Sequence, residues 1–188
     1  EGLIHRDIKS SNVLLESRRS GQPYAYLADF GLVRTIQQAE IESNYTGTPI
    51  PLDQVPGTPH YMAPEQTRGI VTTSTDIYAL GVLLYQMLTG ELPYNDPDDV
   101  EVIKMHLYAP VPNPCTFDAS IPAEVGAIVT RAMAKRAEQR FPDITSLRAA
   151  FLAAIDGPVV HVENLPFTEE EVEEEAFEVH ELPQLSLI

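Results

Sequence analysis

The deciding stretch reads His5-Arg6-Asp7-Ile8-Lys9-Ser10-Ser11-Asn12. Asp29-Phe30-Gly31 follows it, and residues 57–65 then read Gly-Thr-Pro-His-Tyr-Met-Ala-Pro-Glu. A His-Arg-Asp triplet alone is short enough to arise by chance. The three groups in this order, with Asp76 and Gly81 after them, form a far more specific pattern. We therefore expect these groups to determine both the fold and the chemistry.

Two short apolar runs, at residues 12–15 and 25–28, lie between the first two groups. The polar segment 17–23 separates them, so the pattern predicts a small β-hairpin that ends at the Asp-Phe-Gly group. Residues 29–59 lack sustained periodicity and are rich in Thr, Ser, Pro and Gly. Because so long a loop is uncommon in a compact domain unless it has a function, we expect a functional loop here.

A helical pattern begins at Thr75 and Asp76 and stops at Gly90. Its apolar residues lie nearly all round the helix: Ile77, Leu80, Leu83, Leu84, Met87 and Leu88. Such a helix is normally buried. Asp76 would then be an acid near the core, and it would need hydrogen-bonding partners there.

Three further helices are predicted after Gly90. Asp96 has the pattern of an N-cap, with Pro97 at the first helical position and acids in the first turn, and opens a helix to about Tyr108. A proline-rich loop to Pro114 precedes the next helix, over about residues 122–135. The last helix spans residues 143–156 and stops at Gly157. One face of it carries Ile144, Leu147, Phe151 and Ile155.

Composition divides the chain into one core and a tail. The 188 residues, 44% of them apolar, suffice for one globular domain. The formal net charge is −16, and residues 159–188 hold nine Glu without Lys or Arg, so the remainder carries −16 + 9 = −7. Self-repulsion and sparse apolar residues favour disorder in this acidic segment. We therefore predict a domain at residues 1–157 and a disordered tail at residues 158–188.

The same composition excludes several classes of function. Twelve scattered Lys and Arg give no basic cluster, so nucleic acid is not expected as a partner. Cys115 is the only cysteine, which excludes an intrachain disulfide and a cysteine-rich zinc site. No apolar run approaches the length of a membrane span. Because the sequence begins at Glu1, directly before the deciding stretch, we expect a fragment of a longer protein.

The ordered motifs resemble the catalytic domain of eukaryotic-like, bacterial Hanks-type serine/threonine protein kinases. The resemblance covers about residues 2–156. It implies an α+β, protein-kinase-like fold, of which this chain is the mostly α-helical large (C-terminal) lobe with a small β-hairpin. The N-terminal lobe is absent from the sequence and is expected to pack on this one. The resemblance also implies ATP and Mg²⁺ (or Mn²⁺) as cofactors and protein substrates with Ser or Thr acceptors.

By resemblance, Asp7 orients or deprotonates the acceptor hydroxyl, and Lys9 reaches the γ-phosphate. Asn12 and Asp29 would supply oxygen ligands to a magnesium ion shared with the nucleotide. Leu14 matches the residue beneath the adenine ring, with plain core packing as the alternative. Further matches are Thr58, which helps fix Asp7 and Lys9, and the Asp76 carboxylate, which holds the backbone of the catalytic loop.

Other matches are structural or regulatory. His5 and Phe30 resemble two members of a stacked apolar column, although ordinary core residues would look the same, and Gly31 completes the second motif. Glu65 and Arg140 match an ion pair between the end of the activation segment and the last helices. Arg6 would bind a phosphate on that segment, with Thr46 and Thr48 as the candidate sites. Thr35, Ser43 and Tyr45 are weaker alternatives, and an unmodified loop is a further one.

Two departures from the family pattern bear on function. Ser10 stands where many relatives have proline, a change that removes no catalytic atom. The sequence lacks a glycine-rich phosphate loop, a strand lysine and a helix glutamate. We therefore predict that the intact protein phosphorylates Ser/Thr hydroxyls with ATP, whereas this chain alone is inactive. We expect it in the cytoplasm or on the cytoplasmic part of a membrane-anchored protein. The alternative is a catalytically inactive, kinase-like binding or scaffold module.

Overall fold

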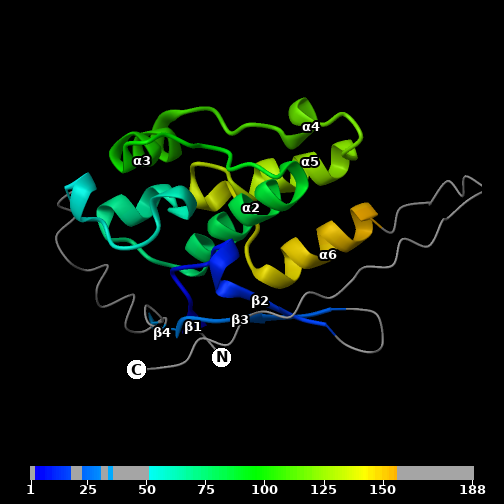
Figure 1. The fold of residues 1–188 in the computed structure, drawn as a ribbon, viewed down its shortest axis with the longest axis horizontal. Coiled ribbons are helices and arrows are strands. Elements are labelled where there is room, and N and C mark those ends of the chain that lie inside the picture. Colours follow the sequence, from blue (N-terminus) through cyan, green and yellow to red (C-terminus); the bar gives the residue numbers. More distant parts are fainter. Residues whose placement is uncertain (1–2, 18–22, 31–33, 36–50, 156–188) are drawn as a thin grey trace, which may run out of the picture. The chain divides into compact units, whose positions relative to one another are not determined.

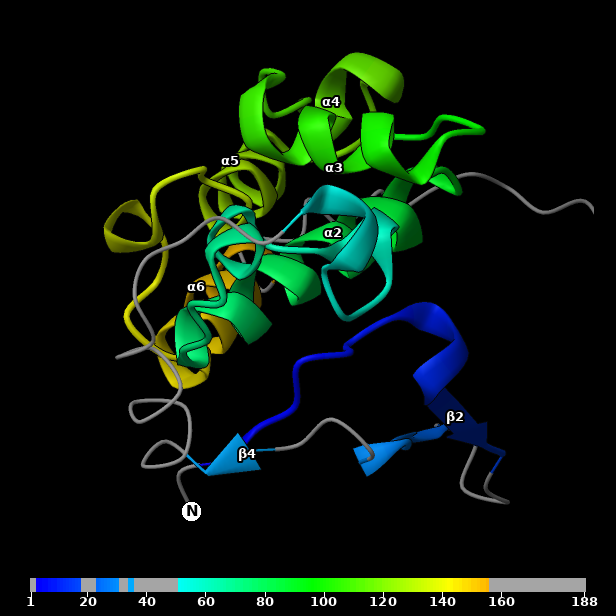
Figure 2. The same ribbon diagram turned by 90° about the vertical axis from the view of Figure 1, so that its left-hand side faces the viewer.

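The computed structural model describes residues 3–17, 23–30, 34–35 and 51–155. Gly31, Thr46 and Thr48 lie outside the described residues, as do Gly157 and the acidic tail. Figures 1 and 2 show the described strands along one side of a group of helices. Between these elements lie short 3₁₀ turns, η1 (Ser10–Asn12), η3 (Leu52–Gln54), η4 (Pro59–Tyr61), η5 (Pro64–Arg68) and η6 (Ala137–Gln139).

The predicted hairpin is confirmed. Strand β2 (Val13–Glu16) pairs antiparallel with β3 (Tyr24–Leu27), and Val13 lies opposite Leu27. The pairing continues past the strands, because Ala28 N donates to Asn12 O at 2.8 Å. A second pair, β1 (Leu3–Ile4) with β4 (Arg34–Thr35), was not predicted. The hairpin thus places the end of the first motif beside the start of the second.

Helix α2 (Thr73–Thr89) lies at the centre of the helical group, as its apolar sequence predicted. It begins slightly earlier than predicted, because Thr72 N donates to Thr75 Oγ1 at 3.1 Å. It ends at Gly90, whose left-handed φ of 77° is accessible to glycine at no steric cost. The prediction of burial on every side fails at Met87, whose side chain is 72% exposed.

The core lies where α2 crosses α5 (Ala123–Ala132). Gly81 permits the close approach: a Cβ there would lie 2.9 Å from both Ala132 Cβ and Met133 Cγ. Aromatic and aliphatic side chains fill the space around this crossing, including Tyr61, Tyr78, Val82, Leu83, Tyr94, Val129 and Met133. Tyr61 belongs to the third motif, so part of the motif region is built into the core.

Helix α3 (Asp99–Tyr108) begins later than the sequence predicted. Its N-cap is Asp98, whose Oδ1 accepts a hydrogen bond from Val100 N at 2.9 Å. Asp96, the predicted cap, instead accepts a bond from Asp98 N at 2.9 Å and turns the chain into the helix. Asp96 therefore turns the chain before the helix, and only Asp98 caps the helix.

The last helices also differ from the prediction in detail. The short helix α4 (Pro114–Phe117) lies in the region expected to be a loop, and α5 ends before the predicted Lys135. Helix α6 (Ile144–Ile155) forms as predicted, but its apolar face is only partly buried. Leu147 is 3% exposed, whereas Ile144 and Ile155 are about half exposed.

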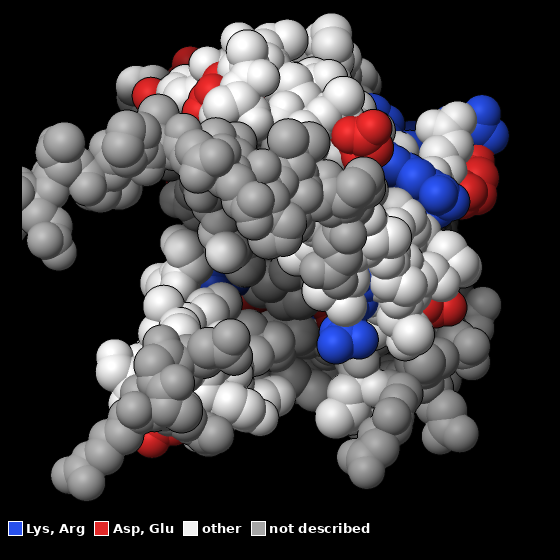
Figure 3. All heavy atoms as spheres, turned by 90° about the vertical axis from the view of Figure 1, so that its right-hand side faces the viewer, with Lys and Arg blue, Asp and Glu red and all other residues white. Residues whose placement is uncertain are grey.

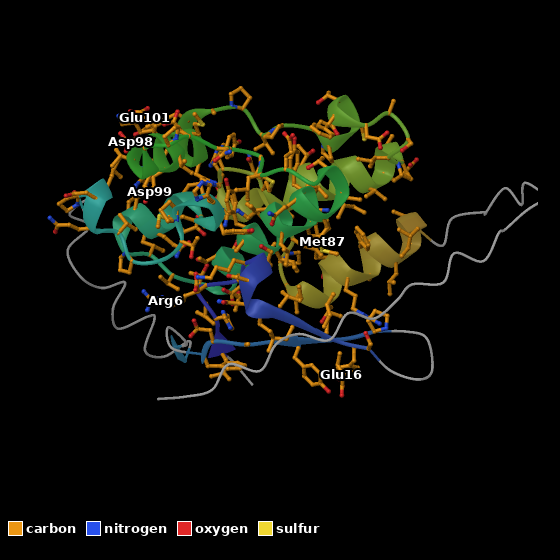
Figure 4. All side chains as sticks on the ribbon, viewed as in Figure 1. Arg6, Glu16, Met87, Asp98, Asp99 and Glu101 are labelled. Carbon is orange, nitrogen blue, oxygen red and sulfur yellow. The ribbon has the colours of Figure 1, made fainter. Side chains whose placement is uncertain are left out.

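Charged side chains are mixed over the surface. Figure 4 shows Asp98, Asp99 and Glu101 together at the start of α3, where acids are stabilised by the helix N-terminus. On the described part of the face drawn in Figure 3, some basic and acidic side chains lie close together. Within the described residues, no helix is both long and apolar enough to cross a membrane.

Candidate active site

The loop that carries the first motif is held by the partly buried carboxylate of Asp76. Asp76 Oδ2 accepts a hydrogen bond from His5 N at 2.7 Å, and Oδ1 accepts one from Arg6 N at 2.9 Å. Arg6 has a φ of 71°, a left-handed conformation that costs a non-glycine residue roughly 1 to 2 kcal/mol. The start of α2 thus fixes a strained turn immediately before Asp7.

The hydrogen-bonding partners expected for Asp76 are therefore present. Burial raises the pKa of Asp76, and the two backbone N–H donors lower it in part. A carboxylate at this position costs desolvation energy, which two hydrogen bonds to its charged form offset. The Asp76 carboxylate thus holds the strained backbone of the loop, and the backbone N–H groups in turn stabilise its charge.

Asp7 lies at the centre of a cluster of polar side chains. Its Oδ2 is 2.6 Å from Lys9 Nζ, and its Oδ1 accepts a hydrogen bond from Thr58 Oγ1 at 2.8 Å. Lys9 Nζ also donates to Thr58 Oγ1 at 2.9 Å, which closes a triangle. Asn12 Nδ2 donates to Asp7 Oδ2 at 3.1 Å and to Asp7 O at 2.8 Å. The structure therefore brings together four of the residues predicted for the site.

This arrangement sets the charge of Asp7. Burial raises the pKa of its carboxyl, but the hydrogen bonds from Lys9, Thr58 and Asn12 outweigh burial, so the pKa lies below its usual value. Asp7 is consequently ionised at neutral pH. With a lowered pKa it is a weak base, suited to orienting a hydroxyl and accepting its proton late.

Oxygen donors for a cation are found at the open end of the hairpin. Both contacts of Asn12 to Asp7 use the amide nitrogen, which leaves Asn12 Oδ1 as an acceptor. Asp29 follows the residue paired with Asn12 and has a left-handed φ of 63°. Among the described residues, no group of three or more His, Cys, Asp or Glu could enclose a metal. One amide and one carboxylate oxygen suit Mg²⁺, which keeps several waters and shares phosphate ligands.

The rings of His5 and Phe30 are in contact, with centroids 5.4 Å apart in an edge-on arrangement. His5 Nε2 lies 3.1 Å from Ala28 O, and because a carbonyl only accepts, this nitrogen carries the proton. His5 is buried, whereas Phe30 is 62% exposed and Leu14 is 56% exposed. The predicted column is thus present in its lower part, and an apolar surface lies open beside it.

Glu65 and Arg140 form a bidentate ion pair. Arg140 Nη1 and Nη2 donate to Glu65 Oε1 and Oε2, both at 2.7 Å. The Arg140 side chain is fully buried and also donates to Ser74 O at 2.8 Å and to Ala134 O at 2.7 Å. This pair joins η5 to the segment after α5, as the sequence predicted.

Some residues around the site had no predicted role. His106 was interpreted only as a surface or core residue, yet it is 1% exposed and its Nε2 lies 3.0 Å from His60 O, inside the third motif. Tyr78 Oη lies 2.8 Å from its other nitrogen. Lys135 Nζ donates to Met105 O at 3.0 Å and to His106 O at 2.7 Å. No periodicity marks these residues, because their partners come from distant elements.

Known proteins are similar in sequence to most of this chain. The model of the family described as protein kinase domain matches residues 1–150. The chain is 36% identical over 155 residues to "Serine/threonine-protein kinase Pkn1" of Myxococcus xanthus, a match that covers 82% of this chain and 21% of Pkn1. It is 34% identical over 159 residues to "Serine/threonine-protein kinase PknH" of Mycobacterium tuberculosis, covering 84% of this chain and 24% of PknH.

A third relative is "DNA damage-responsive serine/threonine-protein kinase RqkA" of Deinococcus radiodurans. It is 38% identical over 140 residues, which make up 74% of this chain and 19% of RqkA. The chain therefore spans about a fifth to a quarter of the length of the curated relatives that it matches.

Proposed function

The chain belongs to the protein kinase domain family, and we propose that it supplies the acceptor-activating part of an ATP-dependent serine/threonine phosphotransferase. One observation carries the proposal: the Asp7 carboxylate is held at hydrogen-bond distance from both Lys9 and Thr58. A module that only binds partners has no chemical need for this set of side chains, so the set disfavours a scaffold.

In the proposed reaction, Asp7 accepts a hydrogen bond from the substrate hydroxyl and aims its oxygen at the phosphorus. The P–O bond to the donor breaks while the bond to the substrate oxygen forms, and the hydroxyl proton passes to Asp7. Such transition states are loose, so little negative charge must develop on the attacking oxygen before the proton leaves. A carboxylate with a lowered pKa is adequate for this role.

Lys9 supplies positive charge at the same place. Its Nζ contacts Asp7 and Thr58, so the ammonium is positioned before any nucleotide binds. Preorganised charge needs little rearrangement during the reaction, which is why it lowers the barrier. Thr58 is a positioning residue in this scheme, because it bonds to both groups and holds them at a fixed separation.

Asn12 Oδ1 and Asp29 are the residues that would hold Mg²⁺. When bound together with ATP, the ion offsets charge on the phosphate oxygens. We infer this donor set from the oxygen types and from their shared end of the hairpin. Leu14 on β2 would lie against the adenine ring, and the exposed face around Leu14 and Phe30 would be covered by an N-terminal lobe.

We expect residues 1–188 alone to show no sustained turnover. They contain no glycine-rich phosphate loop and no strand lysine partnered by a helix glutamate. Stabilising the transferring phosphate requires donors on both sides of the nucleotide. An exposed nucleotide would also bury little of its surface, which weakens binding.

The test is a phosphotransfer assay with radiolabelled Mg·ATP and a generic Ser/Thr protein substrate. The complete protein and the isolated chain are compared, each with an Asp7→Asn variant to exclude contaminating kinases. We expect label transfer only by the complete protein with Asp7 present. Absence of transfer by the complete protein under activating conditions would overturn the proposed function, and sustained turnover by the isolated chain would overturn its expected inactivity.

A further inference from the structure

A chain of hydroxyl groups links the catalytic loop to α2 through the third motif. Ser10 Oγ lies 3.1 Å from Tyr61 Oη, and Tyr61 Oη lies 2.5 Å from Gln86 Oε1. Gln86 Oε1 can only accept, so the single phenolic proton of Tyr61 is directed to it. Tyr61 Oη must therefore accept the proton of Ser10, which gives the chain one direction, from Ser10 to Gln86.

The three groups come from three separate elements. Ser10 begins η1 immediately after Lys9, Tyr61 ends η4, and Gln86 lies in the last turns of α2. The ring of Tyr61 is 8% exposed and is part of the main apolar core, so its hydroxyl is held in a fixed position. Ser10 is exposed, and its bond to Tyr61 joins an open loop to that rigid anchor.

This bond stands beside two others between the same two segments. Thr58, at the other end of η4, bonds to Asp7 and Lys9. The loop 7–10 and the turn 58–61 are thus joined at two points, and two attachment points fix an orientation that one leaves free to rotate. The separation of Asp7 from the backbone of the turn depends on both attachment points.

We propose that Ser10 is a positioning residue that sets the turn 58–61 against Asp7 and so aligns the acceptor hydroxyl. The inference rests on the proposed phosphotransferase function and assigns a role to a residue outside the catalytic set. The side chain is essential to it, because a residue without a hydroxyl group at this position offers no donor to Tyr61 Oη.

The test uses the complete protein and two readouts: kcat/KM for a protein acceptor, and ATP hydrolysis without an acceptor. Ser10→Ala should lower kcat/KM for the acceptor by roughly three- to tenfold, the loss expected for one hydrogen bond. It should leave acceptor-independent ATP hydrolysis unchanged, because Asp7, Lys9 and Thr58 are retained. Ser10→Thr, which restores a hydroxyl, should recover most of the loss.

Two controls make the test specific. Ser11→Ala removes the neighbouring exposed hydroxyl, which forms no hydrogen bond within the part of the chain that the structure describes, and should have no effect. Tyr61→Phe removes the acceptor of the Ser10 bond, so adding Ser10→Ala to it should cause no further loss. A fully additive double variant, or a Ser10→Ala enzyme equal to Ser11→Ala, would overturn the inference.

The wild-type protein shows whether a negative result concerns the role of Ser10 alone or the proposed function as well. If the wild-type protein transfers phosphate but Ser10→Ala has no selective effect on the acceptor reaction, only the role of Ser10 is wrong. A parallel loss of both activities in Ser10→Ala also overturns that role, because general damage to the site would explain it. If the wild-type protein transfers no phosphate, the proposed function fails and the role of Ser10 fails with it.

Discussion

The catalytic loop and the α2–α5 core differ in how they are held. The loop is fixed by a few directional bonds from distant residues: Asp76 holds its backbone, and Thr58 bonds to Asp7 and Lys9. The core is fixed by apolar contact, closest where Gly81 meets Ala132. Removing one polar atom from the loop should therefore affect turnover more than stability, whereas changing volume in the core should do the reverse.

Asp7→Asn should give the largest effect and tests the first half of this comparison. The amide preserves the shape of the side chain but cannot accept the substrate proton, so turnover in the complete protein should fall by about 10²- to 10⁴-fold. Its melting temperature should fall only modestly: the Asn oxygen can keep the bond from Thr58, although the amide nitrogen that replaces Oδ2 would face the donors of Lys9 and Asn12. A kinetic assay and a thermal melt on one preparation check both statements, and a near-normal kcat would remove Asp7 from the mechanism.

The ion pair of Arg140 with Glu65 shares a feature with each region: it is directional, like the bonds of the catalytic loop, and it is buried, like the α2–α5 core. Glu65→Gln removes the charge while retaining the shape. A fully buried guanidinium without its counter-charge should lower stability by about 3 to 5 kcal/mol. The exposed pair Arg136–Glu138 provides a matched control, since solvent screens it and Glu138→Gln should cost far less stability than Glu65→Gln. Urea unfolding of both variants measures the difference, and equal losses would contradict burial as the cause.

Gly81→Ala tests the second half of the comparison. The added methyl group would lie 2.9 Å from Ala132 Cβ and Met133 Cγ, so the helices must move apart. We expect a loss of about 1 to 3 kcal/mol from overpacking, with kcat of the folded protein nearly unchanged. Met87→Ala, at an exposed site on the same helix (Figure 4), should cost under about 0.5 kcal/mol. A large fall in kcat for Gly81→Ala without a fall in stability would reverse the comparison.

The same contrast separates what the sequence predicted from what it could not. The burial of α2 follows from local periodicity, which also indicated that Asp76 needs hydrogen-bonding partners, whereas its contact with the loop was implied by the family resemblance. The loop-to-turn link of Ser10 with Tyr61 had no such signal, because residues far apart in the sequence form it and both carry ordinary hydroxyl groups.

Local sequence also failed at helix ends and on partly covered faces. Asp96 and Asp98 are both plausible caps, and only the reach of a side-chain oxygen to Val100 N selects Asp98. Ile144 and Ile155 continue the apolar face of α6 but remain half exposed, because burial depends on what packs over a residue. Arg6 as a phosphate-binding residue for Thr46 and Thr48 stays a prediction, since both threonines lie outside the described residues.

The effect that should be smallest at neutral pH concerns His106, which joins the core to the third motif. His60 O can only accept, so His106 Nε2 carries a proton and Nδ1 accepts the hydrogen bond from Tyr78 Oη. Neutral His106 satisfies both partners, whereas the charged ring would leave Tyr78 facing a second donor. Burial, together with the nearby positive charge of Lys135, lowers the pKa of His106 to about 3.

The pKa of His106 in the folded state lies below the value of about 6.5 expected in the unfolded chain. Between these values the unfolded state binds more protons, so stability should fall as the pH falls from about 6.5 toward 3. The slope contributed by this histidine approaches about 1.4 kcal/mol per pH unit. His106→Gln keeps one donor and one acceptor but does not titrate, so urea unfolding at pH 7, 6 and 5 should give a flatter profile. An identical slope in wild type and His106→Gln would show that His106 is not the group being titrated.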